Sequence, residues 1–268
     1  MAYCYFSGEI VEESKAFIPI NNQGAHRGFG MFDFFRERDG KLTFMEDHLD
    51  RFENGQKLMR FDSIIPKDKI REAVHSLQQK NHFNNSAFKL MILGDGSDSD
   101  DRYTPLFFIL HLDLNSHQMP VSSNVITYEY LRAYPEIKSI NYLTSNMLHV
   151  RKKEARAIDV VYHKDGLISE ASRSSVFIVK DSKIMTPGKQ ILDGITRKHV
   201  LSFANDISPT LITDVSFQDF LNADEVFLTS TLKEVLPIVK IDGQKVGDGQ
   251  VGSVTKKIQE RFTDHLQA

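Results

Sequence analysis

Four short stretches of the sequence hold residue types that could do chemistry together. A lysine amine that is partly desolvated can act as a nucleophile and a base, and it can bond to an aldehyde. A carboxylate can keep a ring nitrogen protonated, and hydroxyl groups with helix-end amides can bind an anion. The stretches are 136–142 with Lys138, 169–172 with Glu170, 192–197, and 229–231. We interpret them as a lysine for an aldehyde cofactor, a carboxylate that charges its ring, and two anion cradles.

Each of these residues also has a simpler interpretation when it is considered alone. Lys138 follows an apolar context, Tyr134 to Ile137, but most lysines are solvated. Glu170 ends a predicted strand before two small residues, a position that also suits a surface glutamate. Ile195 and Thr196 begin a predicted helix, so their amides could bind an anion, or Thr196 could act only as an N-cap.

Two further groups could bind the same anion. Arg51 could clamp a phosphate with paired donors, although helix spacing by itself favours an ion pair with Asp47 or Asp50. Ser230 and Thr231 end a predicted strand, where they could offer hydroxyls and amides. An ordinary transition from strand to loop explains the same residues.

The composition limits the class of protein. With 268 residues, of which 41% are hydrophobic, the chain can build one large or two modest domains. A formal net charge of −3 gives no basic field for nucleic acid. The single cysteine, Cys4, excludes an internal disulfide, and no histidines have metal-binding spacing. No apolar run reaches the roughly 18 residues of a membrane span, so we expect a cytoplasmic protein that does not bind a membrane. We also expect no metal site.

The order of elements predicts two α+β domains, because strands and helices do not alternate regularly. We place the first domain at 1–114, a linker at 115–120, and the larger second domain, which carries Lys138, at 121–268. Three glycines predict a loop within 21–30, and acidic residues predict another at 94–101. Strands are expected at 31–38, 41–44, 87–93, 106–112, 124–130, 158–163, 174–179, 183–185 and 225–229, and helices at 46–61, 66–79, 144–155, 196–205 and 252–266.

The order and spacing of these segments resemble the class IV (fold-type IV) pyridoxal-phosphate enzymes. This group includes branched-chain aminotransferases, D-amino acid aminotransferases and 4-amino-4-deoxychorismate lyases. The resemblance implies a D-amino acid aminotransferase-like α+β fold with the cofactor between two domains, usually in a homodimer. It covers nearly the whole chain, through 22–36, His48-Leu49-Asp50-Arg51, 138–141, 168–177, Thr186-Pro187, 192–197 and 224–231.

The resemblance also implies a role for each candidate residue. Lys138 would form the Schiff base with pyridoxal 5′-phosphate (PLP) and shuttle a proton, and Glu170 would pair with the pyridine nitrogen. Leu192 would lie under the ring. Tyr142 resembles the tyrosine near the phenolic oxygen of the cofactor, although it is one residue closer to the lysine here. The phosphate would be held by Arg51, Ile195, Thr196, Ser230 and Thr231.

The first two departures from the family pattern fall on the expected substrate side. Arg27, followed by Gly28-Phe29-Gly30, stands where an aromatic residue and Gly-Asp-Gly are common. Phe32-Asp33 stands where an aromatic-Glu pair is usual, and Ser175 replaces a frequent asparagine. We therefore expect Arg27 and Phe32 to contact the substrate, with Arg27 binding a carboxylate.

The activity implied is transamination, in which an amino acid passes its amino group to a 2-keto acid. A lyase that splits aminodeoxychorismate into 4-aminobenzoate and pyruvate would share every cofactor residue, so it stays open as an alternative. A non-catalytic relative would lack Lys138 or Glu170, and both are present. The expected partners are small amino and keto acids.

Overall fold

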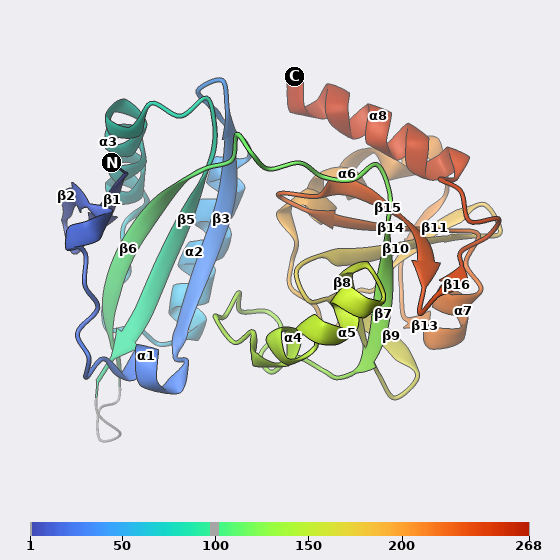
Figure 1. The fold of residues 1–268 in the computed structure, drawn as a ribbon, viewed down its shortest axis with the longest axis horizontal. Helices are drawn as coiled ribbons and strands as arrows, with labels where there is room; N and C mark the ends of the chain where they lie inside the picture. The colour runs from blue at the N-terminus through green and yellow to red at the C-terminus, as the bar shows by residue number, and fades with distance from the viewer. Residues whose placement is uncertain (1, 97–101, 268) are drawn as a thin grey trace. The chain divides into compact units, whose positions relative to one another are not determined.

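The computed structural model describes residues 2–96 and 102–267 (Figure 1). The chain forms two compact units: unit 1 is Met1–His117 with Ile137–Asn141, and unit 2 is Gln118–Glu136 with Tyr142–Ala268. We predicted from the sequence that Lys138 belongs to the second domain, 121–268. The structure instead groups the short segment that contains it with unit 1. Most of the expected acidic loop, 97–101, lies outside the described residues.

The strands of unit 1 are β1 (Tyr3–Phe6), β2 (Glu9–Glu12), β3 (Gly30–Arg38), β4 (Lys41–Leu42), β5 (Asn85–Asp95) and β6 (Thr104–Asp113). They form a six-stranded antiparallel sheet in the order β2-β1-β6-β5-β3-β4. Side chains of a strand point alternately to the two faces, and β3 accordingly alternates buried and half-buried residues. Phe35 of β3 and Phe88 of β5 are opposite each other, and their rings stack 5.5 Å apart on the buried face.

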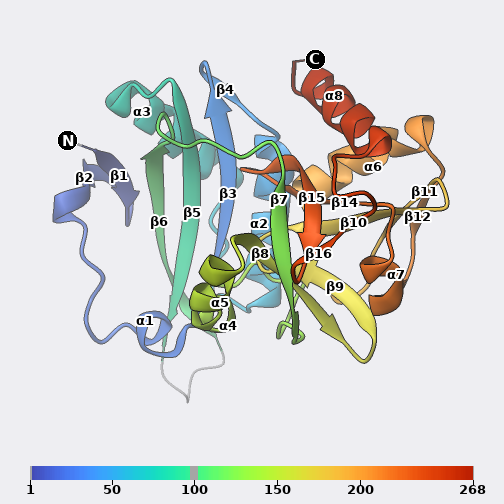
Figure 2. The same ribbon diagram turned by 45° about the vertical axis from the view of Figure 1, so that its right-hand side comes forward.

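Two amphipathic helices, α2 (Met45–Leu58) and α3 (Lys67–Asn81), cover this apolar face (Figures 1 and 2). Leu49 and Phe52 of α2 and Leu77 of α3 join Phe35 and Phe88 in one core. Removing this apolar surface from water is the main force that fixes α2 on the sheet. The position of α2 matters because this helix carries Arg51.

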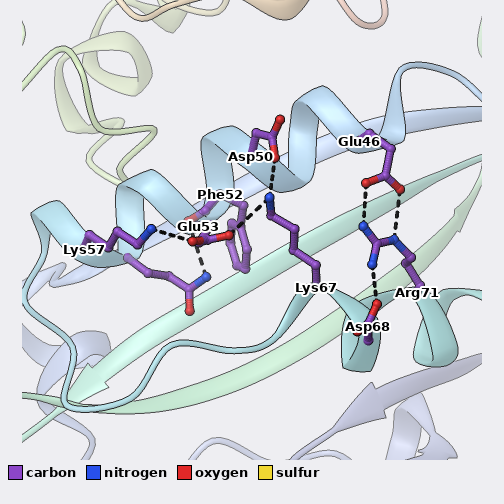
Figure 3. A network of polar contacts seen from close by, with 9 residues as sticks. Glu46, Asp50, Phe52, Glu53, Lys57, Lys67, Asp68 and Arg71 are labelled. Atoms are coloured by element: carbon purple, nitrogen blue, oxygen red, sulfur yellow. Dashed lines mark hydrogen bonds and ion pairs between the residues drawn. The ribbon is translucent and has the colours of Figure 1, made fainter.

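A row of ion pairs on the outer surface joins α2 to the start of α3 (Figure 3). Lys67 contacts both Asp50 and Glu53, and Arg71 contacts Glu46 through two nitrogens at 2.6 and 2.9 Å. Solvent screens such exposed pairs, so each contributes little to stability. They supplement the apolar packing of α2 rather than replace it.

The segment Ile137–Asn141 pairs with the edge of β3 that lies away from β5. The Phe32 amide donates to the Lys138 carbonyl at 2.9 Å, and the Ile140 amide donates to the Gly30 carbonyl at 3.1 Å. A Cβ at Gly30 would lie 3.0 Å from the Ile140 side chain, so glycine allows this close approach. These main-chain bonds explain why Lys138 belongs to unit 1.

The described part of unit 2 contains β7 (Ser123–Glu129), β8 (Ala157–Lys164), β9 (Leu167–Ala171), β10 (Ser175–Lys180), β11 (Lys183–Thr186), β12 (Thr210–Ile212), β13 (Val215–Ser216), β14 (Glu225–Ser230), β15 (Glu234–Ile241) and β16 (Gln244–Lys245). They form one sheet in the order β12-β11-β10-β14-β15-β7-β8-β9-β13, and β16 pairs with β15. Most neighbours are antiparallel, but β7 runs parallel to both β8 and β15. Phe177 of β10 and Phe227 of β14 face each other, with rings 4.7 Å apart in the core.

The helices of unit 2 are α4 (Leu143–Met147), α5 (His149–Glu154), α6 (Ile195–Ile207), α7 (Phe217–Leu221) and α8 (Ser253–Gln267). The long helices α6 and α8 lie side by side next to β14 and β15 (Figure 2). His199 Nδ1 of α6 lies 2.9 Å from His265 Nε2 of α8 and links the two helices. This packing fixes the first turn of α6, where Ile195 and Thr196 are found.

The architecture confirms the predicted α+β class, while two local predictions differ from the structure. The loop expected at 21–30 contains a short helix, α1 (Gln23–Arg27), because the Asn22 side chain accepts from the Ala25 amide and caps it. The single helix expected at 144–155 is divided into α4 and α5 at Leu148. A 3-10 turn, Glu13–Lys15, follows β2. Within the described ranges, no helix has the length and apolar character needed to cross a membrane.

Candidate active site

Two lysine amines lie against one aromatic ring in unit 1. Lys138 Nζ is 4.7 Å from the centroid of the Phe32 ring, and Lys89 Nζ, from β5, is 5.2 Å from the same centroid. Lys89 is half-buried, and burial lowers its pKa. Among residues 2–96 and 102–267, Lys89 has no carboxylate or other hydrogen-bond partner. A partly desolvated cation without a counter-ion is suited to bind an anionic ligand.

Arg51 of α2 is directed to the buried carboxylate of Asp33 on β3. Its Nε and Nη2 donate to the two carboxylate oxygens at 2.9 and 2.8 Å. His48, one helical turn earlier, places Nδ1 2.7 Å from Asp33 Oδ1. Asp50, one of the two partners that helix spacing favoured for Arg51, pairs with Lys67 instead. The guanidinium of Arg51 is therefore oriented by a carboxylate from the sheet.

The charges of this Asp33 cluster balance inside unit 1. Burial by itself would raise the pKa of Asp33, but Arg51 and His48 together lower it well below the usual range. Burial lowers the pKa of His48 and outweighs the raising effect of Asp33, while the charges of Arg51 and Lys138 make smaller contributions that lower it further. The cluster at pH 7 therefore holds one carboxylate, one guanidinium and a neutral imidazole.

Glu170 is the next-to-last residue of β9 in unit 2 and is only 6% exposed. Its Oε1 accepts from Arg132 Nε at 2.8 Å, and its Oε2 accepts from the Leu192 amide at 3.0 Å. Arg132 also donates from Nη2 to the Pro135 carbonyl at 2.6 Å. Two of the predicted residues, Glu170 and Leu192, are thus in direct contact. Each carboxylate oxygen keeps room for a second donor.

The first turn of α6 is buried beside β14. Ile195 and Thr196 are 7% and 5% exposed, and backbone donors of a first helical turn have no acceptor within the helix. A Cβ at Gly194 would lie 2.5 Å from Ser175 Oγ, so a larger residue would fill this space. Thr229, opposite Ser175 in the sheet, has a buried Oγ1 without a partner among the described residues. This region therefore offers donors in a small space, as an anion site requires.

Tyr142, Ser230 and Thr231 also belong to unit 2. Burial raises the pKa of Tyr142 to about 12, against the opposing charges of Arg132 and Arg173, so its hydroxyl stays protonated. Ser230 ends β14, and its Oγ accepts from the amide three residues later at 3.2 Å. This bond closes the turn that contains Thr231.

The remaining two predicted residues, Arg27 and Phe32, belong to unit 1. Arg27 is exposed at the end of α1, and Gly28 follows it with φ of 69°, a left-handed conformation that favours glycine. Phe32 is half-buried on β3 and carries the lysine contacts described above. The structure therefore pairs Phe32 with Lys138 and leaves Arg27 on the surface.

Sequence reasoning missed three charged residues of these clusters. Asp33 was noted only as a departure, although a carboxylate on the buried side of an apolar strand needs a charged partner. Lys89 interrupts the apolar run 87–93, which is a usable signal. Arg132 carried no local signal, because its partner Glu170 is 38 residues away. Within the described ranges, no group of three or more histidine, cysteine or acidic residues could hold a metal ion.

The chain is similar in sequence and fold to named aminotransferases. The family described as "Amino-transferase class IV" matches residues 30–241. The D-alanine aminotransferase of Staphylococcus haemolyticus is 28% identical over 100% of this chain and 99% of its own. A Methanocaldococcus jannaschii protein, provisionally named a branched-chain-amino-acid aminotransferase, is 28% identical over 97% and 95%. The solved branched-chain aminotransferase of Escherichia coli has a TM-score of 0.89 at 25% identity, covering 98% of this chain and 94% of that one.

The chain belongs to the class IV aminotransferase family, since the family match spans most of its length. The predicted family, the fold-type IV architecture and the use of PLP are thereby confirmed. The protein is a PLP-dependent enzyme that moves an amino group between an amino acid and a 2-keto acid.

Proposed function

We propose that Lys138 is the residue that bonds to PLP and that Lys89 binds a carboxylate of the amino acid or keto acid being converted. The observation that carries this proposal is the ring of Phe32, which has both lysine amines beside it. One amine has the position in the sequence at which the family's lysine is expected. The other is a half-buried cation with no counter-ion among the described residues, and every amino acid and 2-keto acid carries a carboxylate.

When bound, PLP supplies an aldehyde and a ring that accepts the electron pair released at the substrate's α-carbon. Lys138 Nζ would take the proton from that α-carbon. In the second half of the reaction, it would deliver a proton to the α-carbon of the incoming keto acid. The carboxylate of Glu170 holds a proton on the ring nitrogen. The protonated hydroxyl of Tyr142 would donate to the phenolic oxygen of PLP, and Leu192 would pack against the PLP ring.

The residues proposed for the phosphate fit such a group. The buried first turn of α6 supplies the amides of Ile195 and Thr196, and the orphaned Thr229 Oγ1 is a buried polar atom that needs a partner. The turn with Ser230 and Thr231 follows directly on the same strand. Arg51 of unit 1, whose guanidinium Asp33 orients, is the remaining residue proposed for the phosphate. Amides, hydroxyls and a guanidinium are the groups that phosphate binding uses.

The test of the function is a panel of L- and D-amino acids, each incubated with the PLP-loaded enzyme and a keto acid. Amino transfer to pyruvate or 2-oxoglutarate is the expected result, and alanine and branched-chain donors are included because the named relatives use these substrates. Conversion of aminodeoxychorismate to 4-aminobenzoate, without transfer from any amino acid, would instead establish the lyase.

Replacing Lys89 with methionine removes the charge and keeps the apolar stem. We expect KM for the best substrate to rise about 10- to 100-fold, because a hydrogen bond to a charged group is worth about 1.5–3 kcal/mol. The matched control is Lys69→Met on α3, an exposed lysine, which should leave KM unchanged. Equal KM values for Lys89→Met and the parent enzyme, across every accepted substrate, would refute the role of Lys89. The same assay with Arg27→Ala tests the carboxylate contact proposed for Arg27.

We also propose that the chain works as a cytoplasmic homodimer. Leu143 and Met147, four residues apart on α4, and Val150 of α5 are apolar side chains that are each at least 63% exposed. A second copy of the chain would cover such side chains. Light scattering of the purified protein should give twice the mass of one chain. The Met147→Asp variant should give a mass closer to that of one chain. A monomeric parent protein would refute the proposal.

A further inference from the structure

A buried ion pair in unit 2 links the turn after Glu170 to the turn that contains Thr231. Lys233 Nζ lies 2.9 Å from Asp159 Oδ2 and donates to Ser174 Oγ at 2.8 Å. Asp159, on β8, is fully buried, and the side chain of Lys233 is only 10% exposed. Asp159 also accepts from the hydroxyls of Ser172 and Ser174. Side chains from two other segments therefore meet at the Asp159 carboxylate.

Each of these segments leads to a residue of the proposed site. Ser172 and Ser174 belong to the connection between β9 and β10, directly after Glu170. Lys233 belongs to the connection between β14 and β15, and its amide donates to Ser230 Oγ at 3.2 Å. Lys233 thus contacts Ser230 of the Ser230–Thr231 turn through its main-chain amide and Asp159 through its side chain.

The arrangement is more specific than packing requires. Replacing a buried ion pair by apolar residues is often neutral or stabilising, so the pair by itself is weak evidence for a purely structural role. Burial alone would raise the pKa of Asp159, but Lys233 and Ser172 lower it below its usual range. Burial lowers the pKa of Lys152, the charges of Arg173 and Lys233 lower it further, and Asp159 opposes this shift. Asp159 therefore interacts with more than one cation as well as with the two serine hydroxyls.

We infer that Lys233 and Asp159 form a positioning pair that holds the Ser230–Thr231 turn in the conformation that binds the phosphate of PLP. This inference rests on the proposed function, in which Ser230 and Thr231 contact that phosphate. Lys233 does not touch the reacting atoms. It acts through the turn, whose hydroxyls and amides are useful only at a defined distance from the anion.

The test compares two cofactors that differ only in the phosphate. The full chain, freed of cofactor by dialysis, is titrated with PLP and with pyridoxal, and binding is followed by absorbance. For Lys233→Met we expect the Kd for PLP to rise about tenfold or more, the size of a lost charged hydrogen bond. The Kd for pyridoxal should stay within about twofold, and Lys233→Arg, which keeps the pair, should retain most of the PLP affinity.

A second variant guards against misfolding. Lys233→Met leaves Asp159 buried and unpaired, whereas the double variant with Asp159→Asn leaves no buried charge and is expected to fold. Lys240→Met, at an exposed position on β15, is the matched control and should bind both cofactors normally. A folded Lys233→Met or double variant with parental affinity for PLP, or an equal loss for PLP and pyridoxal, would overturn the inference. Failure of the parent protein to prefer PLP over pyridoxal would instead overturn the proposed phosphate site.

Discussion

Replacing Lys138 with alanine is expected to lower the rate of amino transfer at least about 10³-fold, since a positioned acid–base group alone contributes 10²–10⁴-fold. The loss should be larger than for any other substitution, because the same amine also bonds to the cofactor. The side chain lies beside Phe32 and is held there by the main-chain bonds of its segment. Alanine keeps those bonds, so the fold of unit 1 should survive.

A chemical readout accompanies the rate measurement. Borohydride treatment of the PLP-loaded parent enzyme should fix the cofactor to a single peptide that contains Lys138, as seen by mass spectrometry. No such peptide should form in Lys138→Ala, while Lys69→Ala, an exposed lysine of α3, should behave like the parent. Labelling of a different lysine in the parent enzyme would show that the catalytic residue has been misassigned.

Replacing Glu170 with glutamine is expected to lower kcat about 10²-fold or more with a smaller change in KM, the pattern of a group that acts in the transition state. Glutamine keeps the shape of the side chain and an oxygen to accept from Leu192. It removes the negative charge that holds a proton on the ring nitrogen and leaves Arg132 without its ion pair. The ring should then accept the released electron pair less readily.

The matched control for Glu170 is another glutamate of unit 2 that is paired with a cation. Glu129 contacts Lys164 at 2.9 Å on the surface, so Glu129→Gln removes a charge and an ion pair without touching the site. It should leave kcat unchanged. A kcat for Glu170→Gln within twofold of the parent value would mean that the carboxylate has no role at the ring.

The parts of the site that are local in sequence could be predicted, because their chemistry depends on near neighbours. The segment 194–197 was expected to begin a helix, and α6 begins at Ile195. Glu170 was expected at a strand end, and it is the next-to-last residue of β9. In both cases backbone preference and the pattern of apolar residues determine the position.

The parts that depend on contacts between distant segments could not be predicted. Arg51 meets Asp33 across 18 residues because α2 packs on the buried face of β3, and helix spacing suggested only nearer partners. Lys233 meets Asp159 across 74 residues, and Lys233 has no local pattern that distinguishes it from a surface residue. A charge is recognisable as buried only when the packing of the sheet is known.

The grouping of Ile137–Asn141 with unit 1 has a consequence for protein engineering. The polypeptide leaves the first unit after His117, returns for five residues, and leaves again before Tyr142. No single cut can therefore yield two complete halves: a fragment that stops at His117 would lack the β3 edge partner and its lysine. Chimaeras made by exchanging the N-terminal portion between relatives would combine a foreign β3 with a native pentapeptide, so crossover points should be chosen on both sides of that pentapeptide.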